Sequence, residues 1–185
     1  MEAFLVSAGL VAIAEIGDRT QLLALLLATR LRKPVPIAAG ILAATLANHA
    51  LAALVGAEVA HWIGPDWMRW ILAATFIAMA GWCLVPDKAD DARATTHAGA
   101  FVTTLVAFFL VEIGDKTQIA TVALAARFNS VLLVTAGTTV GMLLANLPVV
   151  FFGDAIARRV PLGVVRTIAA LLFLALGVLA ALTPL

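Results

Sequence analysis

The chain has 185 residues, of which 63% are hydrophobic and only 12% are charged, with a mean hydropathy of +1.08 and a formal net charge of +1. This composition lacks the polar surface of a soluble domain, and the single cysteine, Cys83, excludes an internal disulfide and a thiolate metal site. The sequence therefore predicts an integral membrane protein whose surroundings are the lipid bilayer, with no nucleic-acid partner.

Six stretches are apolar enough for membrane-spanning helices, which need about 20 residues each. In chain order they are residues 3–29, 36–60, 67–85, 100–126, 131–153 and 163–183. The one segment of ordinary soluble composition, residues 86–99, predicts a cytoplasmic linker. We therefore expect an all-α membrane protein of six transmembrane helices, with one three-helix repeat at 1–85 and a second at 100–185.

The two halves of the chain resemble each other in sequence. A shift of 97 residues aligns EIGDRTQ, at residues 15–21, with EIGDKTQ, at residues 112–118. The same shift pairs Arg30 with Arg127, Gly40 with Gly137, and His49 with Asn146. Matches that extend over two spans favour a duplication. Because each half has three spans, an odd number, the second repeat is expected to be inverted in the membrane.

The distribution of basic residues predicts the orientation. The expected loops on one side of the membrane carry Arg30, Arg32, Lys33, Lys88, Arg93, Arg158, Arg159 and Arg166. The loops on the other side carry only Arg69 and Arg127. By the positive-inside rule, the more basic side faces the cytoplasm, so both termini are expected outside the cytoplasm.

The two motifs place charge deep in the membrane. Each begins about twelve residues into its span, which is close to the bilayer midplane at 1.5 Å per residue. The ionisable residues there are Glu15, Asp18, Arg19, Glu112, Asp115 and Lys116. Left facing lipid, they would together cost on the order of 15 to 20 kcal/mol. They must therefore face one another, water or a ligand.

The acidic residues and glutamines of the motifs predict a cation site. On a continuous helix, the two acidic side chains and the glutamine of one motif fall within an arc of about 160° around the helix axis. They are Glu15, Asp18 and Gln21 in the first motif, and Glu112, Asp115 and Gln118 in the second. If the two arcs meet, they form a shell of about six oxygen donors, which suits Ca²⁺, Mn²⁺ or Mg²⁺. We expect such a transported ion and no cofactor.

The charge of the motifs predicts exchange of the cation for protons. Four carboxylates against Arg19 and Lys116 leave a net charge of −2, which one divalent cation neutralises. When the cation leaves, burial and like-charge repulsion favour the uptake of about two protons. Arg19 and Lys116 are expected to balance charge or to act as a gate. Alternatively, Glu15 with Arg19, and Glu112 with Lys116, form ordinary intrahelical ion pairs at i,i+4 spacing.

Other polar residues are weaker candidates for the site. On a continuous helix, Thr20 and Thr117 point about 140° away from the glutamates, and they either bond to their own helix or reach the cation. Asn48 and Asn146, inside the second and fifth spans, either line the ion's path or hydrogen-bond between helices. His49 offers the same alternatives.

The doubled motif E-x-G-D-[KR]-[TS], present as EIGDRT and EIGDKT, resembles that of the Golgi-type calcium/manganese:proton antiporter family, which includes bacterial manganese exporters. The resemblance covers the whole chain. It implies cation/proton exchange with Glu15, Asp18, Glu112 and Asp115 as cation ligands. For a short bacterial member it implies Mn²⁺ efflux across the inner membrane, in which case the termini that the basic loops place outside the cytoplasm are periplasmic. Manganese rather than calcium rests on the resemblance alone.

Three alternative functions compete with cation antiport. An exporter of a cationic organic solute, such as a basic amino acid, would use the carboxylates, but the motifs contain no aromatic residue for its apolar part. An intramembrane aspartyl hydrolase would use Asp18 and Asp115 as a catalytic pair and would need none of the other charged residues. A passive channel would not need two gates around a buried site. The sequence favours a transporter over an enzyme and leaves the oligomeric state open.

Overall fold

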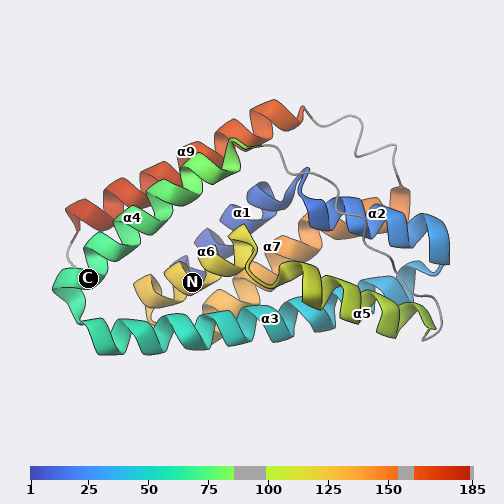
Figure 1. Cartoon of the computed structure of the whole chain (residues 1–185), viewed down its shortest axis with the longest axis horizontal. Coiled ribbons are helices and arrows are strands. Elements are labelled where there is room, and N and C mark those ends of the chain that lie inside the picture. The colour runs from blue at the N-terminus through green and yellow to red at the C-terminus, as the bar shows by residue number, and fades with distance from the viewer. Residues whose placement is uncertain (86–98, 154–160, 184–185) are drawn as a thin grey trace.

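A computed structural model describes residues 1–85, 99–153 and 161–183 (Figure 1). Within these ranges the chain forms eight helices and no strand, which confirms the all-α class. The helices are α1 (Glu2–Glu15), α2 (Arg19–Leu31), α3 (Pro34–Ile63), α4 (Pro65–Cys83), α5 (Gly99–Glu112), α6 (Lys116–Phe128), α7 (Val131–Phe152) and α9 (Leu162–Leu182). The expected linker, residues 86–99, lies outside the described residues except for Gly99.

Three helices are long and apolar enough to cross a membrane by themselves, namely α3, α7 and α9. They coincide with the expected second, fifth and sixth spans. The third expected span corresponds to α4, whose apolar part is shorter. Large apolar side chains such as Leu51, Leu144 and Leu171 are more than half exposed on the outer faces of these helices. Such a surface suits lipid contact.

The expected continuous helices through the two motifs are wrong. Residues 16–18 separate α1 from α2, and residues 113–115 separate α5 from α6. Gly17 and Gly114 have φ angles of +80° and +76°, in the left-handed region that glycine enters without a Cβ clash. Each motif therefore forms a bend between two short helices, and the angles of a regular helix do not apply across it.

The two halves pack against each other through corresponding contacts. Helix α1 packs along α7, and α5 packs along α3. A Cβ atom on Gly137 would lie 2.5 Å from the carbonyl oxygen of Phe4, and one on Gly40 would lie 2.8 Å from that of Phe101. The 97-residue shift converts one contact into the other. These close approaches hold α1 against α7 and α5 against α3 in the same way in the two halves.

Apolar cores lie on both sides of the motifs. Helices α4 and α9 run side by side along one edge of the molecule (Figure 1), where Phe76 and Phe173 pack with ring centroids 6.3 Å apart. The second core contains Leu27 of α2, Ile41 of α3 and Phe108 of α5, all fully buried. The buried carboxylates of the motifs therefore lie between packed apolar side chains.

Gly137→Ala is expected to lower the free energy of unfolding by about 1 to 3 kcal/mol, because the new methyl group would overlap the backbone of α1. Gly9→Ala is the matched control on α1, since a Cβ atom there would meet nothing within 4 Å. It is expected to be neutral or slightly stabilising. Thermal unfolding of both purified variants in detergent measures the difference. Equal melting temperatures would contradict the close packing of α1 on α7.

Candidate cation site

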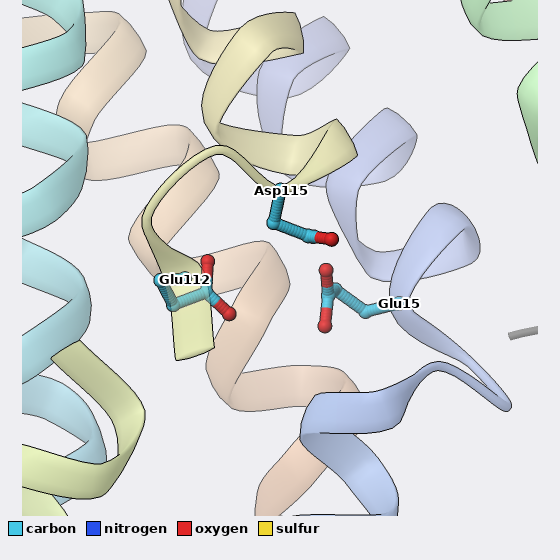
Figure 2. Close-up of side chains that lie close together, drawn as sticks. All are labelled: Glu15, Glu112 and Asp115. Atoms are coloured by element: carbon cyan, nitrogen blue, oxygen red, sulfur yellow. The ribbon is translucent and has the colours of Figure 1, made fainter. Parts of the chain in front are cut away.

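Three carboxylates converge between the two bends. Glu15 ends α1, Glu112 ends α5 and Asp115 precedes α6. One carboxylate oxygen from each residue lies within 4.8 Å of the other two, and Figure 2 shows the three groups turned toward one another. All three residues are at most 2% exposed. Among the described residues, no other group of three or more His, Cys, Asp or Glu side chains lies this close together.

Each glutamate has one carboxylate oxygen that accepts a hydrogen bond and one that does not. The Oε2 atoms of Glu15 and Glu112 accept from the hydroxyls of Thr20 and Thr117, respectively. The Oε1 atoms of both glutamates are buried without a hydrogen-bond partner. An uncompensated buried carboxylate oxygen is costly, and a cation between the carboxylates would compensate both.

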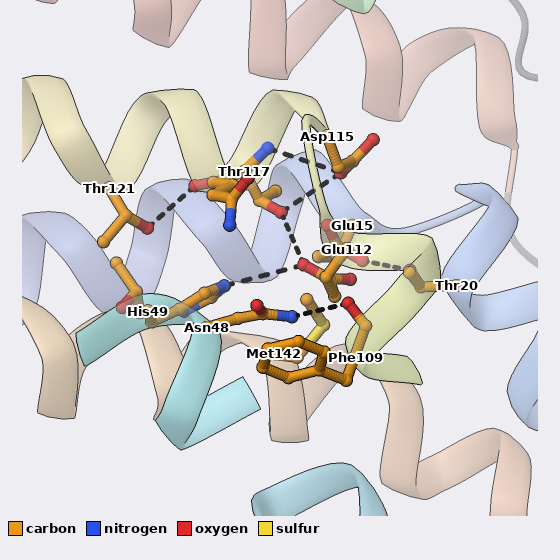
Figure 3. A network of polar contacts seen from close by, with 12 residues as sticks. Glu15, Thr20, Asn48, His49, Phe109, Glu112, Asp115, Thr117, Thr121 and Met142 are labelled. Atoms are coloured by element: carbon orange, nitrogen blue, oxygen red, sulfur yellow. Dashed lines mark hydrogen bonds and ion pairs between the residues drawn. The ribbon is translucent and has the colours of Figure 1, made fainter. Parts of the chain in front are cut away.

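The two threonines face the carboxylates, contrary to the expectation for a continuous helix. Thr20 lies against Glu15, while the Thr117 hydroxyl is 3.4 Å from Oε2 of Glu112 and 3.2 Å from Oδ2 of Asp115 (Figure 3). The reason is the bend, which redirects α2 and α6 relative to α1 and α5. Both hydroxyls therefore position carboxylates of their own motif.

The basic residues form ion pairs between the motifs. Nη2 of Arg19 lies 2.9 Å from Oδ1 of Asp115, and Nζ of Lys116 lies 3.1 Å from Oδ1 of Asp18. The 97-residue shift converts one pair into the other. The aspartates, which an intrahelical pairing of Glu with Arg or Lys would leave unmatched, are thus each matched by the base of the opposite motif.

The two aspartates also cap the helices that follow them. Asp18 accepts a hydrogen bond from the backbone N–H of Arg19 at 2.7 Å, and Asp115 accepts one from that of Thr117 at 3.4 Å. The N-terminus of a helix stabilises negative charge through its free N–H groups and its dipole. Asp18 is buried like Asp115 but is not one of the three clustered carboxylates.

The two glutamines are bonded to the backbone of the bends. Oε1 of Gln21 accepts from the N–H of Gly17 at 2.9 Å, and Oε1 of Gln118 accepts from that of Gly114 at 2.6 Å. The amide of Gln21 also donates to the carbonyl oxygen of Ala145 on α7 at 2.9 Å. In this structure, the amide oxygens that were expected to face the cation stabilise the bends.

The two asparagines make different contacts. Asn48 donates from α3 to the carbonyl oxygen of Phe109 on α5 at 3.0 Å, whereas Asn146 donates to that of Met142 in its own helix, also at 3.0 Å. Asn48 therefore links α3 to α5 at Phe109, which lies three residues before Glu112 in the chain. Asn146 stabilises α7 locally.

His49, a weaker candidate in the sequence, is a polar neighbour of the cluster. Its Nε2 atom lies 3.7 Å from Oε2 of Glu112, and both side chains are fully buried (Figure 3). His49 lies outside the motifs, and the sequence marks it only as a polar residue within the expected second span that aligns with Asn146.

Buried carboxylates at the bends of two broken helices are typical of membrane transporters for cations. The chain belongs to the divalent cation/proton antiporter GDT1 family, which matches residues 3–91 and 100–184. The resemblance drawn from the motifs is therefore confirmed. The family favours cation antiport over export of an organic solute, hydrolysis or a passive channel.

Curated relatives agree with this assignment. A protein of Vibrio cholerae serotype O1 named "Putative manganese exporter" is 54% identical over 175 residues, which cover 94% of this chain and 88% of that protein. "GDT1-like protein 4" of Oryza sativa subsp. indica is 28% identical over 201 residues, which cover 94% of this chain and 70% of that protein. No solved structure matches the chain.

Proposed function

We propose that this antiporter exports Mn²⁺ across the bacterial inner membrane in exchange for protons and binds the ion at Glu15, Glu112 and Asp115. The convergence of three buried carboxylates, two of which have an oxygen without a hydrogen-bond partner, carries the proposal. Such oxygen ligands suit hard divalent cations, Ca²⁺ included. The relative named as a manganese exporter supports Mn²⁺ as the exported ion.

We further propose six spans arranged as two inverted three-helix repeats, 1–85 and 100–185, joined by a cytoplasmic linker. In this arrangement, α1 with α2 and α5 with α6 each form one broken span. The exchange of partners between Arg19 and Lys116 supports a two-fold relation between the halves. Transporters with inverted repeats commonly bind ions at the midplane between broken helices. The basic loops support periplasmic termini.

Arg19 and Lys116 have different parts in the proposed cycle. The Arg19 side chain is 26% exposed and forms an ion pair with Asp115, one of the three proposed ligands. A cation must therefore displace this guanidinium from the carboxylate, and Arg19 can turn toward water. Lys116 is 6% exposed and pairs with Asp18, outside the cluster. It keeps the net charge of the motifs at a value that one divalent cation or two protons neutralise.

Purified protein in proteoliposomes tests the function. With the vesicle interior more acidic than the medium, we expect Mn²⁺ uptake as protons leave, and none in protein-free vesicles. Nigericin in K⁺ buffer, which collapses the proton gradient, is expected to stop the uptake. Ca²⁺ and Mg²⁺ at the same concentrations measure selectivity. Mn²⁺ uptake at the same rate with and without the proton gradient would exclude antiport. Transport of Ca²⁺ alone would exclude Mn²⁺ as the substrate.

A further inference from the structure

We propose that His49 is a nitrogen ligand of the transported cation and sets the preference for Mn²⁺ over Ca²⁺ and Mg²⁺. This inference rests on the proposed function, because it adds a donor to the same site. His49 approaches the carboxylates from α3, a helix that contributes no residue of either motif. It therefore enlarges the site beyond the acidic residues of the two bends.

The position of the imidazole ring fits a shared cation better than a direct bond. The 3.7 Å between Nε2 of His49 and Oε2 of Glu112 exceeds the length of a hydrogen bond. Two atoms that bind one cation at about 2.2 Å each lie about 3 to 4.4 Å apart. Figure 3 shows the ring directed at the Glu112 carboxylate. The separation thus leaves room for both atoms to contact the same ion.

The ring also lacks other partners. His49 is fully buried, and neither of its nitrogens has a hydrogen-bond partner within the described part of the chain. A neutral imidazole has one N–H donor and one acceptor nitrogen, and leaving both unmatched in the interior costs free energy. Asn146, its counterpart in the second half, donates to its own helix instead. If His49 only filled space, an apolar side chain would do so without the free-energy cost of two unpaired nitrogens.

A neighbouring contact holds the ring in place. Asn48 hydrogen-bonds the carbonyl oxygen of Phe109, which fixes α3 against the last turn of α5. Glu112 ends that turn. The adjacent residue of α3, His49, is thereby kept beside the Glu112 carboxylate. A ligand that is positioned in advance loses less freedom when the cation arrives.

A nitrogen donor changes the selectivity of an oxygen site. Ca²⁺ and Mg²⁺ take oxygen ligands almost exclusively, whereas first-row transition ions also accept imidazole. Carboxylates alone discriminate Mn²⁺ from Ca²⁺ mainly by size and coordination number. With His49 in the coordination shell, Mn²⁺ gains a bond that Ca²⁺ does not use. The structure thus supplies a chemical reason for preferring a transition ion such as Mn²⁺ over Ca²⁺ and Mg²⁺, which the motifs by themselves do not.

His49→Asn tests the inference, because it introduces the residue found at the corresponding position of the second half. His61→Asn is the matched control, since His61 is exposed near the end of the same helix. In proteoliposomes, we expect His49→Asn to raise the KM for Mn²⁺ about tenfold and to leave that for Ca²⁺ unchanged. His61→Asn is expected to change neither. An unaltered ratio of Mn²⁺ to Ca²⁺ transport in His49→Asn would overturn the inference.

Electron spin-echo spectroscopy of Mn²⁺ bound to the purified protein is a second measurement that does not depend on transport. We expect ¹⁴N coupling in the wild type and in His61→Asn, and its loss in His49→Asn. If His49→Asn fails to fold, ¹⁵N-histidine labelling of the wild type must convert the ¹⁴N signal to ¹⁵N. A wild type that transports Mn²⁺ without nitrogen coupling overturns the inference and leaves the proposed function standing. A wild type that neither binds nor transports Mn²⁺ overturns the proposed function itself.

Discussion

Glu112→Gln is expected to reduce proton-driven Mn²⁺ transport by about 100-fold or more. The substitution keeps the size of the side chain and removes one of the three negative charges of the cluster. Loss of one member of a buried charge interaction costs about 3 kcal/mol, and each 1.4 kcal/mol is a factor of ten. Glu15→Gln is expected to act in the same way, because the 97-residue shift relates the two positions.

Glu58→Gln is the matched control for both variants. Glu58 is an exposed glutamate near the end of α3, so the same chemical change is expected to leave transport unaltered. All variants are compared by initial rates of Mn²⁺ uptake at equal amounts of reconstituted protein. Wild-type rates in Glu112→Gln and Glu15→Gln would show that the clustered carboxylates are not the cation site.

Lys116→Met is expected to destabilise the protein more than Arg19→Met. Lys116 and its partner Asp18 are almost completely buried, so removal of the lysine leaves a carboxylate in the interior without its ion pair. Removal of one partner from such a pair costs about 3 to 5 kcal/mol. Arg19→Met also leaves a buried carboxylate, that of Asp115, without its ion pair, but the Arg19 side chain is 26% exposed, so its charge is less desolvated than that of Lys116 and its pair is weaker. Melting temperatures in metal-free detergent solution measure the difference.

The double variant Asp18→Asn with Lys116→Met separates the ion pair from the packing of the lysine chain. Because it removes both charges, it is expected to recover most of the stability that Lys116→Met loses. If the double variant is as unstable as Lys116→Met alone, the loss comes from packing. Equal small losses for Lys116→Met and Arg19→Met would contradict the difference in burial between the two pairs.

The sequence by itself determined the class of protein and the helical fold, and it singled out the acidic residues of the two motifs. Hydropathy over about 20 residues is a local property, so the apolar spans α3, α7 and α9 were predicted close to their observed bounds. The repeat was also visible in the sequence, since EIGDRTQ and EIGDKTQ differ at one position. Charges at that depth require partners whatever the fold, and this requirement predicted a buried site before any helix was placed.

Only the tertiary structure decided how the motifs are bent and which groups meet. The bend at Gly17 is held by Gln21, which bonds both the turn and the distant Ala145 on α7. No local pattern contains that second contact, and a glycine in an apolar run is also compatible with a continuous helix. The continuous helix that we predicted therefore directed the Thr20 side chain away from Glu15, whereas in the structure the two side chains are in contact.

The composition of the cluster likewise depended on contacts between the halves. The repeat makes Asp18 and Asp115 equivalent in sequence, yet only Asp115 joins the two glutamates, while Asp18 pairs with Lys116. His49 lies beside Glu112 because α3 packs along α5. Hydropathy and motif spacing indicate whether a segment requires an apolar environment or partners for its charged groups. The packing of distant helices determines which side chains meet that requirement.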